Sequence, residues 1–524
     1  MDGSGSGKSA AYSIPNAYQM LGSYVFTDPK GELYDKTAGY LKEHGYEIKV
    51  LNLVKPSNSD GYNPLMHISS EIDVDIIANT IVKGQKSEGN NSDPFWDDSA
   101  EMLLKSLIYY LIATRPEEEQ NLASCAELVR AANKTGGSNL LSELMSQLPY
   151  DHPARMNYKS IEIAPEKTYS SILSTLQSKL GKFDSKEIAE LTSTDTIKFE
   201  DIGTKKTALY VISSDTHTAY DFILTIFFSQ MIQQLYNFAD EKGGTLPIPT
   251  YFILDEFANI GKVPDFDKKI STSRSRKISF SVILQNLDQL EAVYEKSYET
   301  IIGNCDTHVF LGSNSYKTVE YFSKALGEKT IGRDSVSVNK DKHNWRTGHS
   351  VSDQVMARAL MTPDELRRLD NDICIIFEKG IKPIKANKYY YFKHPMAKDL
   401  NKVQISHNNV EGIERGPWRK FNPYNPWTEG NSNTSGASNL KVESLDDLFE
   451  EDKEESKEEK VEQMAEAVTS TVSNVSTPVF EMEIESEPEP VTLPLETEDD
   501  SYDLQKELEA KFDELFGPID EENK

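Results

Sequence analysis

Residues 3–9 read Gly-Ser-Gly-Ser-Gly-Lys-Ser and combine the residue types that bind a nucleoside triphosphate. Glycine lacks a Cβ, so a loop with three glycines lets backbone N–H groups approach phosphate oxygens closely. Lys8 would place its charge on the β- and γ-phosphates, and the hydroxyl of Ser9 would bind Mg²⁺. A helix beginning at about residue 9 would add its positive end. The stretch therefore predicts a loop that binds ATP and Mg²⁺, with glycines Gly3, Gly5 and Gly7.

One position of this loop departs from the full motif. The motif places a glycine five residues before the glycine of Gly-Lys-Ser, and Asp2 stands there instead. A carboxylate near the phosphates is expected to weaken nucleotide binding, because like charges repel. The alternative is a Gly/Ser linker that runs into a lysine by chance, and a second nucleotide motif is needed to decide between the two.

Such a motif lies farther along the chain. Thr250–Leu254 is a continuous apolar run typical of a strand buried on both faces, and Asp255 and Glu256 follow it directly. Hydrolysis needs a carboxylate that holds the Mg²⁺ shell and a group that polarises the attacking water. We therefore expect Asp255 on the metal side and Glu256 as the base. Together with the glycine-rich loop, this pair predicts a nucleotide hydrolase.

Polar residues around the next expected strand, Ser279–Leu284, would complete this site. Gln285 follows the strand, where a glutamine could sense the γ-phosphate. Arg274 or Arg276, in the basic segment before the strand, could reach the nucleotide of a neighbouring subunit as an arginine finger. The alternative for these arginines is a solvated basic helix end.

Alternating strands and helices must position these residues. Ser23–Thr27 and residues 46–53 are expected strands on either side of a helix at 33–44. This order predicts a parallel sheet whose ligands lie at the carboxyl ends of the strands. Asp28 is expected at such an end, where it would support the nucleotide, support the next subunit or form a turn salt bridge with Lys30.

The alternation stops between residues 95 and 192, where the spacing of leucines predicts helices only. The fold class is therefore α/β: a P-loop NTPase sheet domain with an inserted all-helical domain and a disordered acidic tail. The later strands are expected at 196–199, 207–212, 250–254, 279–284, 307–311, 372–377 and 389–392. The expected domains are 1–94 (first part of the sheet domain), 95–192 (helical insert), 193–400 (second part of the sheet domain) and 401–524 (linker and tail).

The negative charge of the chain is concentrated at its carboxyl end. Residues 441–524 carry 29 acidic residues against 7 lysines, a net charge of −22. The other 440 residues hold 56 acidic and 49 basic residues, a net charge of −7. The tail composition is typical of disorder, and it suits a basic protein partner better than DNA. The globular part has no obvious basic footprint for DNA.

Cysteine usage and hydropathy exclude two other classes of protein. Cys125, Cys305 and Cys374 show no paired spacing, which argues against a disulfide framework and a cysteine-based zinc site and favours a reducing compartment. No stretch reaches 18 apolar residues, so neither a membrane span nor a signal peptide is expected.

With both nucleotide motifs in place, the chain resembles the TraG/TraD-like coupling proteins of type IV secretion and conjugation over about residues 3–395. The matching stretches are 3–9, Tyr24–Leu33, Phe95-Trp96, Ile253–Phe257, Ile283–Leu290, Leu360–Leu369 and Gly380–Pro383.

The resemblance implies a RecA-like nucleotide-binding fold that assembles as a homo-hexamer and uses ATP to feed a relaxase–DNA complex into a secretion channel. The implied partners are DNA, relaxase and relaxosome proteins and channel proteins, at the cytoplasmic face of the bacterial cell membrane. The helical insert would bear on DNA or substrate selection. The implied site residues are Lys8 and Ser9 for the nucleotide, Asp255 and Glu256 as the Walker B pair, Gln285 as the sensor and Arg274 as the finger.

Members of this family usually carry a membrane anchor and a first strand before the loop. Neither is found in this sequence, so we expect an amino-terminally truncated chain. Two alternatives remain open: a DNA pump of the FtsK or HerA kind, and a non-hydrolysing docking receptor with a defective loop. The pump would need a DNA-reading winged-helix end, whereas this carboxyl end is acidic. The receptor would be indifferent to Lys8→Ala.

Overall fold

The structure is a computed structural model that describes residues 7–84, 93–132, 139–214, 219–339, 348–400, 402–410 and 413–423. These residues belong to one compact unit, Met1–Asn433. A second unit, Thr434–Lys524, lies outside the described residues. The expected disorder of the acidic tail therefore stays a prediction.

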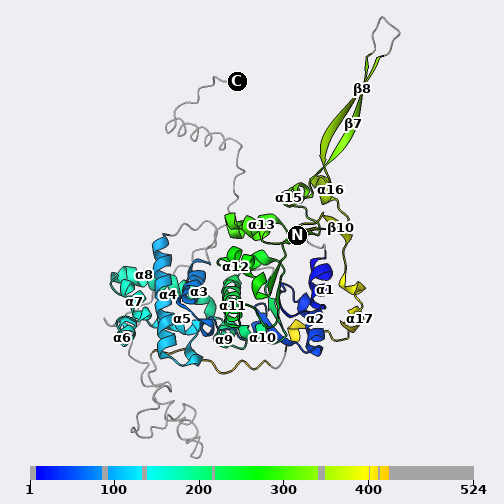
Figure 1. Cartoon of the computed structure of the whole chain (residues 1–524). Coiled ribbons are helices and arrows are strands. Elements are labelled where there is room, and N and C mark those ends of the chain that lie inside the picture. The colour runs from blue at the N-terminus through cyan, green and yellow to red at the C-terminus, as the bar shows by residue number, and fades with distance from the viewer. Residues whose placement is uncertain are drawn as a thin grey trace, which may run out of the picture. The chain divides into compact units, whose positions relative to one another are not determined.

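A five-stranded parallel sheet lies within this unit (Figure 1). Its strand order is β2-β3-β1-β4-β5, so β4 lies between β1 and β5. The strands are rich in β-branched and aromatic residues, which suit a pleated surface covered on both faces. Their bounds are β1 (Ser23–Thr27), β2 (Glu47–Asn52), β3 (Thr207–Ile212), β4 (Thr250–Leu254) and β5 (Ile278–Val282).

Alternate side chains of the sheet enter two cores, because successive residues of a strand point to opposite faces. Tyr24 and Phe26 of β1 pack in one core with α1 and α2. Val25, between them, packs in the other core with α3 and α11. The helices that cover the two faces are therefore α1 (Ile14–Ala17), α2 (Glu32–Glu43), α3 (Glu71–Lys83) and α11 (Asp221–Glu241).

A region of helices follows α3 in the chain. Within 93–132 and 139–193 the described residues form helices and loops but no strand. The leucines whose spacing predicted α4, including Leu103, Leu107 and Leu111, are fully buried against the neighbouring helices. The helices are α4 (Pro94–Thr114), α5 (Leu122–Ala131), α6 (Leu140–Ser146), α7 (Pro153–Glu162), α8 (Glu166–Leu180) and α9 (Lys186–Ser193).

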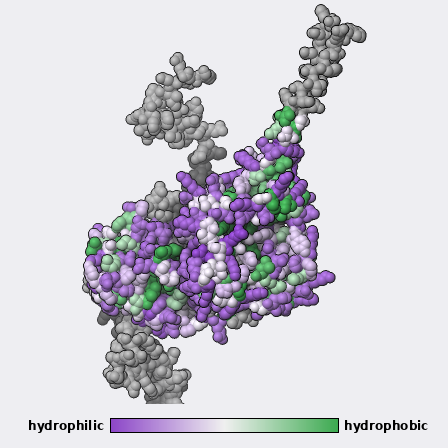
Figure 2. Space-filling view, in the orientation of Figure 1, coloured by the Kyte–Doolittle hydropathy of each residue, from purple (hydrophilic) through white to green (hydrophobic). Residues whose placement is uncertain are grey.

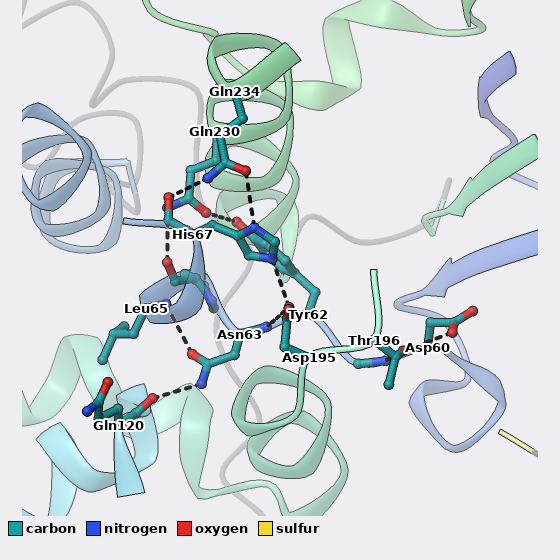
Figure 3. A network of polar contacts seen from close by, with 12 residues as sticks. Asp60, Tyr62, Asn63, Leu65, His67, Gln120, Asp195, Thr196, Gln230 and Gln234 are labelled. Atoms are coloured by element: carbon teal, nitrogen blue, oxygen red, sulfur yellow. Dashed lines mark hydrogen bonds and ion pairs between the residues drawn. The ribbon is translucent and has the colours of Figure 1, made fainter. Parts of the chain in front are cut away.

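A polar network joins this helical insert to the sheet domain (Figure 3). Asn63 donates its side-chain N–H to the carbonyl of Gln120 in the insert over 2.8 Å. His67 Nε2 lies 2.8 Å from Oδ1 of Asp195, which directly follows the last helices of the insert. The network therefore joins the segment before α3 to the insert and to the chain that leaves it. None of the helices in the described residues is both long and apolar enough to cross a bilayer.

The second part of the sheet domain carries two smaller sheets. One has the order β10-β9-β6, and the other is an antiparallel ribbon of β7 and β8. Hydrophobic side chains gather over the base of this ribbon (Figure 2), where Val355 and Met356 are 72% and 45% exposed. The strands are β6 (Thr307–Phe310), β7 (Glu328–Asn339), β8 (Gly348–Ala359), β9 (Ile373–Glu378) and β10 (Ile384–Asn387). The remaining helices are α10 (Phe199–Thr204), α12 (Phe266–Thr272), α13 (Leu287–Tyr294), α14 (Tyr298–Gly303), α15 (Tyr316–Leu326), α16 (Pro363–Arg367) and α17 (Ala397–Leu400).

Two expected strands were wrong. Residues 196–198 form a loop and Phe199 begins α10; the hydroxyl of Thr196 donates to Asp60, and the segment joins no described sheet. Residues 389 and 390 lead into a 3₁₀ turn, η9 (Tyr391–Lys393), and the last strand among the described residues is β10. In both cases aromatic and β-branched residues suited a strand, but neither segment pairs with a strand of the described sheets.

Residues 402–410 and 413–423, which we call the C-terminal strap, lie where the sequence predicted a linker. His407 Nδ1 lies 2.8 Å from Asp35 Oδ1 of α2. Farther along, Arg419 donates to Glu119 of the insert over 2.7 Å. Phe421 is buried in the core of the insert. The strap therefore runs from the sheet domain to the helical insert.

Candidate nucleotide-binding and hydrolysis site

The described part of the glycine-rich loop begins at Gly7 and leads directly into a helical segment. Gly7 has φ of +84°, a left-handed conformation that favours glycine. Its carbonyl accepts a hydrogen bond from Ala11 N–H over 2.7 Å as the π-helical turn η1 (Ser9–Ser13) begins. Lys8 and Ser9 therefore stand at the start of a helical turn, where free N–H groups favour an anion. Gly3 and Gly5 lie outside the described residues.

The structure brings this loop onto the end of β4, as the two motifs predicted. Lys8 Nζ lies 3.6 Å from Oδ1 of Asp255 and 3.8 Å from Oε1 of Glu256. The hydroxyl of Ser9 donates to Asp255 Oδ2 over 3.2 Å. These three contacts join residues about 250 positions apart at the carboxyl end of a parallel strand, which is the usual ligand edge of such sheets.

Neighbouring groups hold Asp255 in place. The hydroxyl of Thr27, at the end of the adjacent strand β1, donates to the backbone carbonyl of Asp255 over 2.7 Å. The backbone N–H of Glu256 donates to Asp255 Oδ1 over 3.0 Å. Burial raises the pKa of the Asp255 carboxyl, and the positive charge of Lys8 opposes that rise. A bound cation would stabilise the ionised form of this buried carboxylate further.

Two amides fix the carboxylate of Glu256. Its backbone is left-handed, with φ of 52° and ψ of 48°, an uncommon conformation for a residue other than glycine. The side-chain amide of Gln285 donates to Oε1 over 2.9 Å, and that of Asn259 donates to Oε2 over 3.2 Å. The side chain of Glu256 is 24% exposed against 8% for Asp255, so Glu256 faces the accessible side of the pair. This placement suits a base that contacts water.

Sequence reasoning missed Thr27 and Asn259. Asn259 lies three residues after Glu256, within the turn η6 (Phe257–Ile260). A polar side chain at this spacing can reach back to the carboxylate, so the spacing itself was a usable signal. Thr27 ends a strand whose pairing with β4 becomes known only from the sheet order.

The basic segment before β5 lies apart from this site. Arg274 is 93% exposed, and its guanidinium lies 3.9 Å from the carboxylate of Asp306. Arg276 instead pairs with Asp240 and lies over the ring of Tyr236 at 4.8 Å. Of the two candidate fingers, Arg276 is held within its own chain and Arg274 reaches solvent.

Asp28 binds the start of α2. It is 2% exposed, and its Oδ2 accepts the backbone N–H of Tyr34 over 2.8 Å. Desolvation raises the pKa of this carboxyl to about 6, and hydrogen bonds from the first turn of α2 oppose the rise. The sequence predicted three roles for Asp28: support of the nucleotide, support of the next subunit, or a turn salt bridge with Lys30. Its contacts show a different role, a buried cap on a helix in the first sheet crossover.

Comparison with known proteins agrees with this geometry. Residues 1–412 match the sequence model of a family described as type IV secretory system conjugative DNA transfer. The conjugal transfer protein TraG of Escherichia coli is 25% identical over 429 residues, which cover 75% of this chain and 66% of TraG. Protein VirD4 of Rhizobium radiobacter is 26% identical over 426 residues, covering 76% of this chain and 57% of VirD4. The chain thus spans less than two thirds of the length of these relatives.

Solved structures of the bacterial conjugative coupling protein TrwB share the fold. An unbound form aligns with a TM-score of 0.54 at 17% identity, covering 79% of this chain and 86% of that protein. TrwB in complex with ADP and Mg²⁺ aligns with a TM-score of 0.53 at 16% identity, covering 74% and 84%. The likeness confirms the predicted sheet domain with a helical insert.

Proposed function

This chain belongs to the type IV secretory system conjugative DNA transfer family, and from that premise we propose that it is an ATP-driven coupling protein. It would recruit a relaxase–DNA complex and drive its transfer to the secretion channel. The single observation that carries the catalytic part is the meeting of Lys8 and Ser9 with Asp255 and Glu256 at one strand end.

The residues present fit ATP and Mg²⁺. Lys8 Nζ, the Ser9 hydroxyl and the Asp255 carboxylate converge, and hydroxyl and carboxylate oxygens are the ligands that Mg²⁺ prefers. Lys8 would leave the carboxylates to bind the β- and γ-phosphates. Bound Mg²⁺ would neutralise charge that develops on the transferred phosphoryl group. The backbone N–H groups of the loop that contains Gly3, Gly5 and Gly7 would bind the phosphates.

Glu256 would act on water. With both carboxylate oxygens held by Gln285 and Asn259, it is oriented to accept a proton from the attacking water. Gln285 would sense the γ-phosphate through the same hydrogen bond. Arg274 is exposed on the surface and would stabilise the transition-state charge on the nucleotide of a neighbouring copy in a homo-hexamer.

The proposed partners follow from the family. They are DNA, relaxase and relaxosome proteins, and channel proteins at the cytoplasmic face of the bacterial cell membrane. The family match favours this function over a chromosome pump of the FtsK or HerA kind. Hydrolysis of ATP distinguishes this function from a docking receptor that binds substrate without hydrolysing ATP.

The experiment is ATP hydrolysis with and without DNA by the wild-type chain, Lys8→Ala and Glu256→Gln. The proposal expects hydrolysis that rises with DNA, is lost with nucleotide binding in Lys8→Ala, and is lost without loss of binding in Glu256→Gln. A chain that binds relaxase but neither binds nor hydrolyses ATP is a docking receptor. DNA-stimulated hydrolysis without any relaxase binding would favour a general DNA pump.

A further inference from the structure

An aromatic run that the proposed chemistry does not use lies against the phosphate loop. A Cβ added to Gly7 would lie 3.1 Å from Cε1 of Tyr390, so this ring and the loop backbone are in contact. The turn η9, with Tyr391 and Phe392, directly follows Tyr390 and packs beside η1. The chain thus returns, some 380 residues after the loop, to place aromatic side chains at its edge.

Two of these rings form a stacked pair. The rings of Tyr390 and Phe392 are nearly parallel, with an angle of 6° and centroids 5.2 Å apart. Tyr390 is anchored, because its hydroxyl donates to Asp372 Oδ1 over 3.0 Å. Phe392 is 60% exposed, a large exposed fraction for a phenylalanine. The pair therefore has a fixed inner ring against the loop and an open outer ring.

The ring of Tyr391 stands at 74° to that of Phe392, with centroids 5.6 Å apart. Tyr391 packs with the core under α2, and Lys36 Nζ lies 5.6 Å from its ring centroid. Tyr391 therefore holds η9 to the sheet domain and leaves Phe392 outside. These two ring contacts leave 60% of Phe392 exposed, next to the tyrosine that touches the phosphate loop.

We propose that Phe392, backed by Tyr390, is the stacking platform for the base of the nucleotide whose phosphates lie on Gly7, Lys8 and Ser9. This inference rests on the proposed function, because it needs the phosphates at the loop. Tyr390 touches the loop at Gly7 and stacks on Phe392, so a base whose ribose and α-phosphate extend from the loop would reach the Phe392 ring. A nucleobase presents a flat π-face that stacks on such a ring whatever the base.

The platform predicts how the affinity divides between base and phosphates. Loss of one base–aromatic stack weakens binding by about 5- to 100-fold. The phosphates are held by other groups, so inorganic tripolyphosphate with Mg²⁺ should bind as well without the phenyl ring as with it. Stacking tolerates different bases, so GTP should depend on Phe392 as ATP does.

The test measures dissociation constants of MgATP and Mg-tripolyphosphate for the wild-type chain, Phe392→Ala and Phe392→Trp. Tyr316→Ala is the matched control, because Tyr316 is an aromatic residue of α15 that is 66% exposed. We expect Phe392→Ala to lose about 5- to 100-fold in ATP affinity with tripolyphosphate unchanged. Phe392→Trp should bind ATP like the wild type, and Tyr316→Ala should bind both ligands normally.

Each other outcome is decisive. ATP affinity unchanged in Phe392→Ala overturns the platform and leaves the proposed function intact. Equal losses for ATP and tripolyphosphate also overturn it, because they show that Phe392 supports the loop rather than the base. A wild-type chain that binds neither ligand overturns both proposals together.

Discussion

The side chain of Gln285 donates a hydrogen bond to Oε1 of Glu256 over 2.9 Å, which joins the ends of two adjacent parallel strands. Because Lys8 Nζ lies 3.8 Å from the same carboxylate oxygen, loop, base and sensor meet at one atom. If Lys8 moves away from Glu256, the charge around Oε1 changes, and so does the strength of the hydrogen bond from Gln285. Gln285 lies in the loop that follows β5, so that loop is coupled to the phosphate loop. Through these two contacts, binding of a nucleotide at Lys8 would change the position of the loop after β5.

Replacing the proposed base should separate binding from hydrolysis. Glu256→Gln keeps the shape of the side chain but removes its ability to accept a proton, so hydrolysis should fall by about 10²- to 10⁴-fold. ATP affinity should stay close to that of the wild type. Phosphate release and equilibrium binding measure the two effects. The exposed Glu299→Gln serves as control, and hydrolysis retained in Glu256→Gln would remove this residue from the mechanism.

Removing the amide that orients the base should have a smaller effect. In Gln285→Ala the Glu256 carboxylate loses its donor at Oε1 but keeps Asn259 at Oε2. We expect kcat to fall by about 10- to 100-fold with little change in KM, because orientation is lost while the nucleotide contacts remain. Steady-state kinetics check this. An equal fall in nucleotide affinity would mean that Gln285 contacts the nucleotide in the ground state.

Stability should depend on pH through Asp28. Its folded-state pKa is raised to about 6, so between about pH 4 and pH 6 the folded chain keeps a proton that the unfolded chain releases. The free energy of unfolding should therefore fall as pH rises through this window. Asp28→Asn has no proton to lose and keeps an acceptor for Tyr34. Above pH 6 it should be more stable than the wild type by up to about 3 kcal/mol.

Urea denaturation at pH 4 and pH 7.5 measures this difference. The two chains should be similar at pH 4 and diverge at pH 7.5. The exposed Asp151→Asn should show no such divergence. If Asp28→Asn were less stable than the wild type at pH 7.5, the carboxylate would be stabilised by its contacts on α2 more than burial destabilises it.

The strands of the sheet could be read from the sequence. Three expected strands, at 23–27, 207–212 and 250–254, match the structure residue for residue. Such short apolar runs have few other ways to be buried. The meeting of Lys8 with Asp255 could be predicted for the same reason, because both follow from where parallel strands end.

Contacts between segments that are far apart in the sequence could not be predicted from the sequence. Tyr390 lies at the loop only because η9 packs on η1, and the aromatic run by itself was equally compatible with a strand. The C-terminal strap has no periodic apolar pattern, since its buried contacts come from isolated residues such as Phe421. Composition rich in Asn, Gly and Pro indicates a linker whether or not such residues find partners.

The strap leads to the last prediction. The side chain of Glu119 is fully buried, and it accepts from Arg115 over 2.6 Å and from Arg419 over 2.7 Å. When a buried carboxylate loses an ion-pair partner, less of the free-energy cost of removing its charge from water is offset. Arg419→Ala should therefore lower the free energy of unfolding by about 1–3 kcal/mol. Arg368→Ala is the control, because its pair with Asp364 is exposed and should contribute less than about 1 kcal/mol.

Limited proteolysis gives a second measurement on the same variants. If the strap ties the insert to the sheet domain, Arg419→Ala should be cleaved within the strap under conditions in which the wild type and Arg368→Ala are intact, because a strap that opens locally exposes its backbone. The unfolding transition should also broaden or split as the insert becomes less coupled to the sheet. Unchanged stability together with unchanged cleavage would mean that Arg115 alone satisfies Glu119 and that the strap is held by its other contacts, such as Phe421.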